Sequence, residues 1–252
     1  MKAGALLTMA FCGICGLTGC ASQPRGAVCF TFDDYHGENW LKADPLFKKY
    51  GAHVTFFVAR EITPEKAEVM KKLQAAGHTI GIHSLHHSRA IPFIHEHSEA
   101  EYIAEEILPQ LDACRKYGLE IHSFAYPYSQ RDDDSDRMLF RYFDHLRSGR
   151  GSAEKTMYYP LKNLPGKCCF VGTGIGRRYK SELSVMKAEL TRAAETNSVL
   201  VYYSHNIGPA DKIGGIDMRT DWLEELLAHA QKLNLRIVGF DELNGLASSG
   251  EN

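Results

Sequence analysis

Acidic and histidine side chains that can bind a metal ion follow short apolar segments at separate points of the chain. Asp33 and Asp34 come directly after one such segment, His83 and His87 follow a second, and His205 closes a third. Each segment is rich in β-branched or aromatic residues, which is typical of a buried strand. Because a parallel sheet or barrel collects its functional groups at the C-terminal ends of its strands, we expect these side chains to meet.

Metal-assisted hydrolysis is the chemistry that these residue types predict. His83 and His87 are four residues apart, so they share one face of a helical turn, whereas His86 would lie about 100° away from His87. Two imidazoles and one carboxylate leave coordination positions open, as a catalytic metal requires. A water bound there has its pKa lowered toward about 7, and a second, free carboxylate beside it can take the proton.

Each of these pairs also has a simpler structural interpretation. Aspartates are common at helix caps and in turns, so Asp33 and Asp34 alone would not define a site. A histidine pair alone would favour a polar surface loop. The combination of the two segments is what predicts a metal site with an adjacent base.

Four segments of the chain, residues 31–34, 83–87, 124–128 and 201–205, resemble the motifs of a known enzyme family. Their sequences, order and approximate spacing are similar to those of the NodB-type polysaccharide deacetylases, carbohydrate esterase family four. The resemblance implies an α/β fold, a distorted (β/α) barrel of about seven parallel strands. It places the catalytic domain at residues 27–248.

The resemblance also implies a role for each polar residue at the strand ends. Asp33 would be the general base, and Asp34, His83 and His87 would hold a divalent metal, usually Zn2+ and sometimes Co2+ or Ni2+. His205 would be the general acid that protonates the leaving amine. The simpler interpretation of His205 is a histidine that closes a buried strand.

The third motif implies substrate contacts and departs from the family pattern. The segment at Tyr128 would donate a backbone N–H to the oxyanion, and the Tyr126 and Tyr128 rings would line the sugar groove. Many members carry an arginine, paired with the base, where this chain has Ala125. Arg147 or Arg150, from the next strand end, is our hypothesis for the replacement.

Two further expectations concern the surroundings of the site. In the family an acidic residue often orients the acid histidine, and Asp217 and Asp221 are the candidates here, although Asp221 is equally explained as a helix cap. Trp40 and Trp222 lie near predicted strand ends. We expect them to join the two tyrosines in stacking on sugar rings.

Strand-like and helix-like segments alternate along the chain, which indicates βαβ units and a mostly parallel sheet. The pattern predicts strands at residues 28–32, 54–58, 78–82, 121–125, 198–204 and 235–238. It predicts helices at residues 41–50, 64–76, 98–117, 135–143, 182–196 and 220–233. Residues 147–178 have little periodicity, so we expect irregular structure there with one or two weak strands.

The N-terminus has the pattern of a secretory signal. Lys2 is the only charge in the first twenty residues, and a short apolar segment ends in Leu17-Thr18-Gly19-Cys20. This ending resembles the lipobox of bacterial lipoproteins, which implies a signal at residues 1–19, lipid attachment at Cys20 and a tether at residues 20–26. The alternatives are an ordinary signal peptide and an N-terminal anchor helix. We expect a lipid-anchored protein of the bacterial cell envelope, in the outer membrane.

Composition and charge narrow the function further. The chain of 252 residues has ordinary hydrophobic (44%) and charged (24%) fractions, so it suits one α/β domain of barrel size. A formal net charge of −2 gives no basic footprint, so nucleic acid is not an expected partner. The predicted function is metal-dependent removal of N-acetyl groups from a cell-envelope or extracellular polysaccharide. Hydrolysis of another C–N bond or an O-acetyl ester, and non-catalytic glycan binding, are the alternatives. The oligomeric state is left open.

Overall fold

The computed structural model describes residues 25–150 and 156–248. The predicted signal at residues 1–19, the predicted lipid-attachment residue Cys20 and most of the predicted tether therefore lie outside the described residues. Within the described part of the chain, no helix has the length and apolarity needed to cross a membrane.

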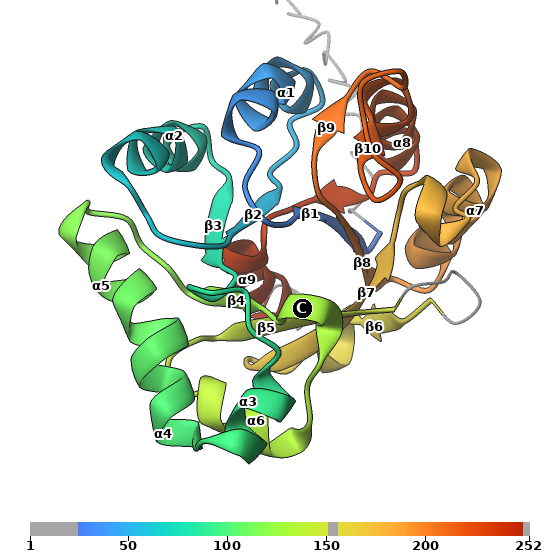
Figure 1. Ribbon diagram of the computed structural model, residues 1–252. Coiled ribbons are helices and arrows are strands. Elements are labelled where there is room, and N and C mark those ends of the chain that lie inside the picture. The colour runs from blue at the N-terminus through green and yellow to red at the C-terminus, as the bar shows by residue number, and fades with distance from the viewer. Residues whose placement is uncertain (1–24, 151–155, 249–252) are drawn as a thin grey trace, which may run out of the picture.

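Seven parallel strands close into a barrel with helices around it (Figure 1). The strand order is β1-β2-β3-β4-β5-β7-β8, and pairing of β8 with β1 along its whole length closes the ring. The barrel strands are β1 (Ala27–Phe32), β2 (Thr55–Val58), β3 (Thr79–Ile82), β4 (Ser123–Ala125), β5 (His145–Arg150), β7 (Cys168–Gly174) and β8 (Ser198–Ser204). This arrangement confirms the predicted fold class.

Helices connect the strands and form the outer layer. The α-helices are α1 (Gly37–Lys49), α2 (Pro64–Ala75), α3 (Ala90–Glu96), α4 (Glu99–Tyr102), α5 (Leu108–Lys116), α6 (Asp133–Leu139), α7 (Leu183–Glu195), α8 (Thr220–Lys232) and α9 (Leu243–Ser248). A π-helical turn, η1 (Ile103–Ile107), joins α4 to α5. The 3-10 turns are η2 (Pro127–Ser129), η4 (Leu161–Asn163), η5 (Arg177–Tyr179) and η6 (Phe240–Glu242).

Four short strands complete the sheets. Strand β11 (Arg236–Ile237) pairs in parallel with the start of β1, and β6 (Tyr158–Pro160) pairs antiparallel with β8. Strands β9 (Ile207–Gly208) and β10 (Met218–Arg219) form a separate parallel pair after β8.

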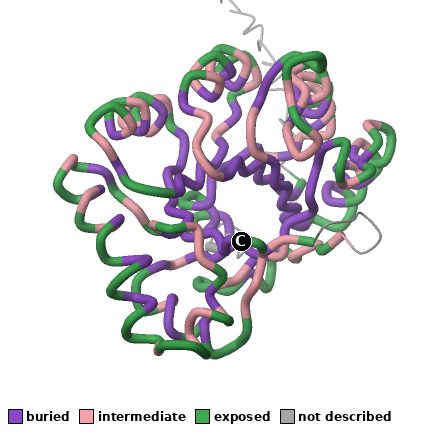
Figure 2. Tube along the Cα trace, viewed as in Figure 1, coloured by how far each residue is buried: buried purple, intermediate pink, exposed green. Residues whose placement is uncertain are grey.

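Alternation along the strands divides the buried side chains into two cores. On β1, Val28, Phe30 and Phe32 belong to the larger cluster, which lies between the strands and the helices. Cys29, one step along, belongs to a second cluster that includes Phe240. Successive residues of a strand point to opposite faces, so the second cluster occupies the inside of the barrel. Figure 2 shows the resulting ring of buried strands, with exposed residues on the outer sides of the helices.

Aromatic side chains fill the inside of the barrel below its C-terminal mouth. Phe57 and Phe170 pack there with Phe240 and with Leu243 of α9. Nearer the C-terminal ends of the strands, the inward-facing positions carry buried polar residues, among them Asp33. The candidate chemical groups therefore lie at the C-terminal mouth, above this aromatic cluster.

The single helix expected at residues 98–117 is wrong, because the π turn η1 divides it. Residues 147–178, where irregular structure with one or two weak strands was expected, contain most of β5 and all of β6 and β7, and β5 and β7 belong to the barrel. Their periodicity is weak because inward positions carry glycine. A Cβ on Gly149 would lie 2.6 Å from the Tyr203 ring, so a small residue is needed there.

Gly81 on β3 provides a test of the interior packing. A Cβ at this position would lie 2.5 Å from the Phe57 ring and 2.8 Å from the Ser123 carbonyl oxygen. We predict that Gly81→Ala lowers the free energy of unfolding by about 1–3 kcal/mol, as overpacking does, measured by urea denaturation. Gly166, with no heavy atom within 4 Å of its added Cβ, is the control, and Gly166→Ala should be nearly neutral. Equal effects of the two substitutions would contradict this packing.

Candidate active site

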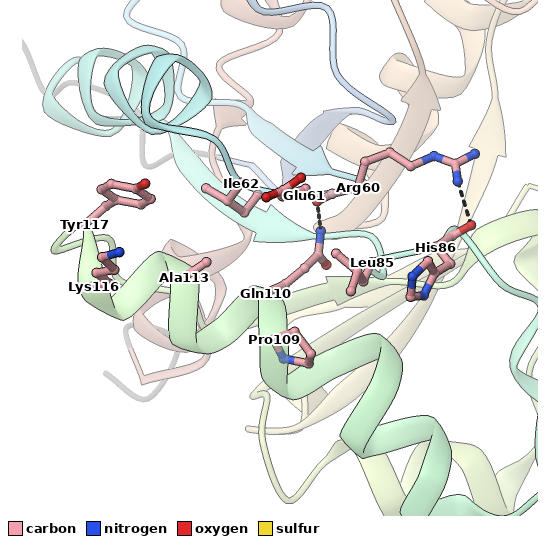
Figure 3. Close-up of a pocket in the computed structure, with 10 residues that line it drawn as sticks. All are labelled: Arg60, Glu61, Ile62, Leu85, His86, Pro109, Gln110, Ala113, Lys116 and Tyr117. Atoms are coloured by element: carbon pink, nitrogen blue, oxygen red, sulfur yellow. Dashed lines mark hydrogen bonds between the residues drawn. The ribbon is translucent and has the colours of Figure 1, made fainter.

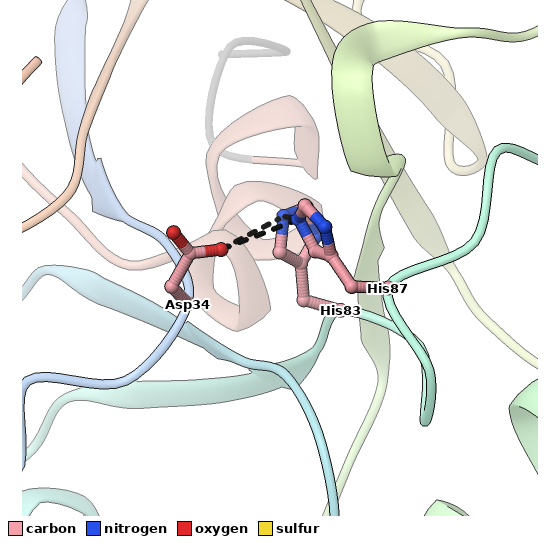
Figure 4. Close-up of side chains that lie close together, drawn as sticks. All are labelled: Asp34, His83 and His87. Atoms are coloured by element: carbon pink, nitrogen blue, oxygen red, sulfur yellow. Dashed lines mark hydrogen bonds and ion pairs between the residues drawn. The ribbon is translucent and has the colours of Figure 1, made fainter.

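Three side chains converge at the C-terminal mouth of the barrel (Figure 4). Oδ1 of Asp34 lies 3.7 Å from Nε2 of His83 and 3.3 Å from Nε2 of His87. The two imidazole Nε2 atoms are 3.2 Å apart. Ligand atoms of all three residues lie within 4.8 Å of one another, close enough to share one ion. The structure therefore brings together the three residues that the resemblance assigned to the metal.

The three side chains are positioned by residues at strand ends and by residues with left-handed backbone conformations. They do not lie on a helix. Asp34 follows β1 with φ 74°, and its carbonyl accepts a hydrogen bond from Ala59 N–H at 2.6 Å. We name residues 83–88 the metal-binding loop after its predicted role, and this loop contains two left-handed residues, Ser84 (φ 63°) and His87 (φ 60°). The helical turn expected from the four-residue spacing is thus wrong. Left-handed conformations cost energy for residues with a side chain, so the surrounding contacts must hold this loop.

One hydrogen bond determines which nitrogen of His83 faces the site. Its Nδ1 lies 2.7 Å from the carbonyl oxygen of Ala125. A carbonyl only accepts, so Nδ1 carries the proton and Nε2 presents a lone pair to Asp34. Burial lowers the pKa of His83 to about 4, so the ring is neutral near pH 7 and can act as a ligand.

The Asp34 carboxyl is held in its charged form. Burial would raise its pKa, but the hydrogen bond with His87 and the electrostatic interactions with His83, His205 and His87 outweigh burial. The pKa therefore lies below its ordinary value. Two imidazole nitrogens and one carboxylate on one side of a point, with open space in front, fit a divalent transition metal with free coordination positions.

A buried ion pair adjoins the three ligands. The guanidinium of Arg147, on β5, contacts Oδ2 of Asp33, and both side chains are almost fully buried. The guanidinium lies between two rings, 5.4 Å from the centroid of Phe57 and 4.9 Å from that of Tyr203. Of the two candidates from the sequence, Arg147 is the one placed against Asp33, whereas Arg150 is exposed at the strand end.

The other carboxylate oxygen of Asp33 is available for chemistry. Oδ1 is buried and has no hydrogen-bond partner among the described residues. A buried carboxylate oxygen normally has a partner, so an unpaired one beside a ligand set indicates a position for a reacting water.

His205 lies on the other side of Asp34 from the metal-binding loop. Its Nε2 is 3.9 Å from Oδ2 of Asp34, and its Nδ1 faces the carbonyl oxygen of Ile216 at 3.3 Å. A backbone carbonyl thus orients this ring. The expected carboxylates have other partners: Asp217 accepts from Asn206 N–H, and Asp221 pairs with Arg219.

A cleft of about 660 Å³ opens above these residues. Tyr128 is 59% exposed on its wall, with its ring centroid 4.8 Å from that of His87. The guanidinium of Arg89 lies 4.5 Å from the centroid of the Tyr128 ring. Arg178 and Tyr179 line the same cleft.

Two predicted sugar-stacking residues cannot have that role. Tyr126 is fully buried, and its hydroxyl donates to Asp136 at 2.8 Å. Trp40 is also fully buried, and its Nε1 donates to the His205 carbonyl at 3.0 Å, so it holds the backbone of His205 instead. Trp222 is only partly buried and lines a separate pocket. Both corrections arise because proximity to a strand end does not determine which way a ring points.

Sequence reasoning did not identify three residues of the cleft wall. Arg89, Arg178 and Tyr179 lie outside the four motifs, and Arg178 and Tyr179 come from the turn η5 after β7. If β7 had been predicted as a barrel strand, the residues that follow it would have been expected at the C-terminal mouth, beside the other site residues.

The family relation agrees with this fold and site. Residues 21–141 match the family model for polysaccharide deacetylase. This match to one part of the chain agrees with the resemblance of the four motifs to the NodB-type polysaccharide deacetylases. No curated protein sequence matches the chain.

Solved structures with a similar fold have low sequence identity. One is the peptidoglycan deacetylase PdaC from Bacillus subtilis, with 16% identity, 91% of this chain and 94% of that chain covered, and a TM-score of 0.61. Another is the chitin deacetylase from the fungal pathogen Colletotrichum lindemuthianum, with 18% identity, 89% of each chain covered and a TM-score of 0.59. At these identities the likeness shows the fold alone.

The buried ion pair gives a prediction about stability. Replacing Arg147 with methionine leaves the Asp33 carboxylate buried without its partner, which typically costs about 3–5 kcal/mol. We expect Arg147→Met to lower the free energy of unfolding in urea by an amount of this order. Arg150→Met, on the same strand but exposed, is the matched control and should change it by no more than about 0.5 kcal/mol. If both variants had the same free energy of unfolding, the ion pair between Arg147 and Asp33 would not stabilise the fold as predicted.

The lowered pKa of His83 gives a second prediction. The folded value is about 4, whereas that of the unfolded chain is about 6.5, so the unfolded chain takes up the proton first as the pH falls. Above about pH 6.5 the neutral His83 ring makes its full contribution to the free energy of unfolding of the metal-free protein. As the pH falls from about 6.5 to 4, the protein should lose up to about 3 kcal/mol of that free energy. Urea unfolding of His83→Gln should show a correspondingly smaller loss across the same window. A variant that loses as much stability as the wild type would refute the assignment.

Proposed function

We propose that this protein is a metal-dependent deacetylase that removes N-acetyl groups from a cell-envelope or extracellular polysaccharide. The observation that carries the proposal is Oδ1 of Asp33. It is a buried carboxylate oxygen with no partner among the described residues, held by Arg147 beside a two-histidine, one-carboxylate ligand set. A protein that only bound glycans would not need such a base.

Each residue of the mouth has a definite task in this reaction. Asp34, His83 and His87 would hold a divalent cation, which would polarise the amide carbonyl and make a bound water more acidic. Asp33 accepts the proton of the attacking water through Oδ1, while Arg147 fixes its other oxygen. His205 then donates a proton from Nε2 to the leaving amine, with its Nδ1 oriented by the Ile216 carbonyl.

Tyr128 has the tasks of oxyanion stabilisation and substrate contact in the proposal. Its backbone is left-handed, with φ 55°, and its ring is exposed beside His87. A backbone N–H aimed at the developing oxyanion stabilises the tetrahedral intermediate more than the ground state. The exposed ring supplies a flat apolar surface for a sugar.

The nature of the substrate rests on the cleft and on the family. An open cleft with an aromatic wall suits a polymer chain better than a small enclosed molecule. Structures of similar fold come from a peptidoglycan deacetylase and a chitin deacetylase, which supports an N-acetylated glycan as the substrate class. We further propose, from the N-terminal pattern, that a lipid anchor at Cys20 holds the enzyme in the cell envelope, near such polymers.

The alternative of a non-catalytic glycan-binding protein was based on the absence of an arginine at position 125. Arg147 reaches Asp33 from the neighbouring strand β5, so the charge is supplied from another position. This contact favours the enzyme over the binder.

Acetate release is the test of the proposed function. Zinc-loaded protein should release acetate from chitooligosaccharides or peptidoglycan, and acetylated xylan tests the O-acetyl ester alternative. Asp33→Asn should lower kcat about 10²–10⁴-fold while metal stays bound, because only the general base is removed. Asp221→Asn, which alters an exposed ion pair with Arg219, is the control and should keep wild-type activity. Tight glycan binding without acetate release would reject the proposal.

A further inference from the structure

A buried carboxylate lies directly behind the metal-binding loop, residues 83–88. Glu106, only 1% exposed, is part of the π turn η1 on the outer side of the barrel. Its Oε2 accepts a hydrogen bond from His86 N–H at 2.8 Å, and its Oε1 accepts one from the Ser88 hydroxyl at 2.5 Å. The Nδ1 of His86 lies 3.2 Å from the same Oε1. None of the four motifs includes Glu106.

These contacts flank the metal ligand His87 on both sides. His86 precedes it and Ser88 follows it, so the carboxylate fixes the backbone before His87 and the side chain after it. The Glu106 carbonyl also accepts from Leu85 N–H at 3.0 Å. Because His87 is left-handed, with φ 60°, this part of the loop needs outside contacts to keep its conformation.

The same helical segment also binds the neighbouring strand end. Gln110, four residues after Glu106, donates through Nε2 to the carbonyl oxygens of Val58 at 3.2 Å and Arg60 at 2.6 Å. Arg60 in turn donates through Nη1 to the His86 carbonyl at 2.8 Å (Figure 3). One face of the helix thus ties together the ends of β2 and β3, from which the cleft and the metal-binding loop begin.

The π turn explains how two polar side chains come to face inward. A π turn contains an extra residue, which rotates the following helix relative to the preceding one, and such turns occur frequently at functional sites. Glu106 and Gln110 are separated by about one turn, so both point to the barrel. Burying a carboxylate is costly, and here three groups of the metal-binding loop compensate for that cost.

We propose that Glu106 is a positioning residue that sets the metal-binding geometry of His87. The inference rests on the metal-dependent function proposed above and adds a residue to its machinery. Glu106 acts through hydrogen bonds that orient the loop. Outer partners of metal ligands typically contribute about 10–100-fold in metal affinity.

Zn2+ binding to the metal-free protein is the test, with Glu106→Ala, Glu106→Gln and a matched control. We expect Glu106→Ala to weaken Zn2+ binding about 10–100-fold. Glu106→Gln should restore most of the affinity, because its amide can accept from His86 N–H and donate to the Ser88 oxygen. Glu189→Ala removes a buried carboxylate that accepts from the Tyr202 hydroxyl, away from the loop. That control should lower the Tm while leaving the Zn2+ affinity unchanged.

The outcomes separate this inference from the proposed function. If Glu106→Ala does not fold, Ser88→Ala removes a single hydrogen bond to the same carboxylate, and it should weaken Zn2+ binding by a smaller factor. Unchanged affinity in Glu106→Ala, or in Ser88→Ala, would overturn the positioning role. An equal loss in Glu106→Gln and Glu106→Ala would also overturn it, because charge would then matter and not position. A wild-type protein that binds no Zn2+ would instead overturn the metal-dependent function itself.

Discussion

The hydrogen bond from Nδ1 of His83 to the Ala125 carbonyl is the interaction on which the site depends. It leaves Nε2 of His83 as an acceptor, 3.7 Å from the Asp34 carboxylate and 3.2 Å from Nε2 of His87. Two electron-rich groups that face each other across this distance are stable together when a cation lies between them. His87 adds a third ligand atom from the same loop. The ligands follow β1 and β3, and the carbonyl comes from β4, so the parallel pairing of β1 through β4 is a condition for the site.

The barrel separates structural and chemical tasks along its axis. Phe57 and Phe170 fill the lower interior together with Phe240, and Arg147 lies on top of this apolar layer, with its guanidinium beside the Phe57 ring. Arg147 then contacts Asp33 at the mouth. A charge this deep in the protein needs its partner, and the apolar floor prevents the pair from moving downward or becoming solvated. The proposed general base and the stability of the barrel mouth therefore depend on the same ion pair.

The parts of the fold and the site that could be predicted are those with a local signal. Apolar segments that end in Asp33, His83 and His205 identified three strand ends, and barrel topology brought them together. Strand β7 had no such signal, because Gly172 and Gly174 occupy inward positions where Tyr203 needs space. The spacing of the two metal histidines was informative, although a left-handed loop and not a helix produces their convergence.

Directions of side chains were the least predictable feature. Trp40 and Tyr126 lie near strand ends, yet both rings are buried, because their polar atoms have buried hydrogen-bond acceptors. The choice between Arg147 and Arg150 depended on strand alternation, which places the first inside the barrel and the second at its rim. Such outcomes depend on tertiary contacts that residue spacing does not contain.

X-ray absorption spectroscopy of the zinc-loaded protein tests the central claim most directly, because it reports the atoms bound to the metal. The account predicts one zinc per chain with nitrogen and oxygen neighbours at about 2.0–2.2 Å, including two imidazoles, and loss of one imidazole in His87→Ala. A sulfur neighbour at about 2.3 Å, which would indicate the partly buried thiols of Cys168 and Cys169, would contradict it. An unchanged spectrum in His87→Ala would do the same.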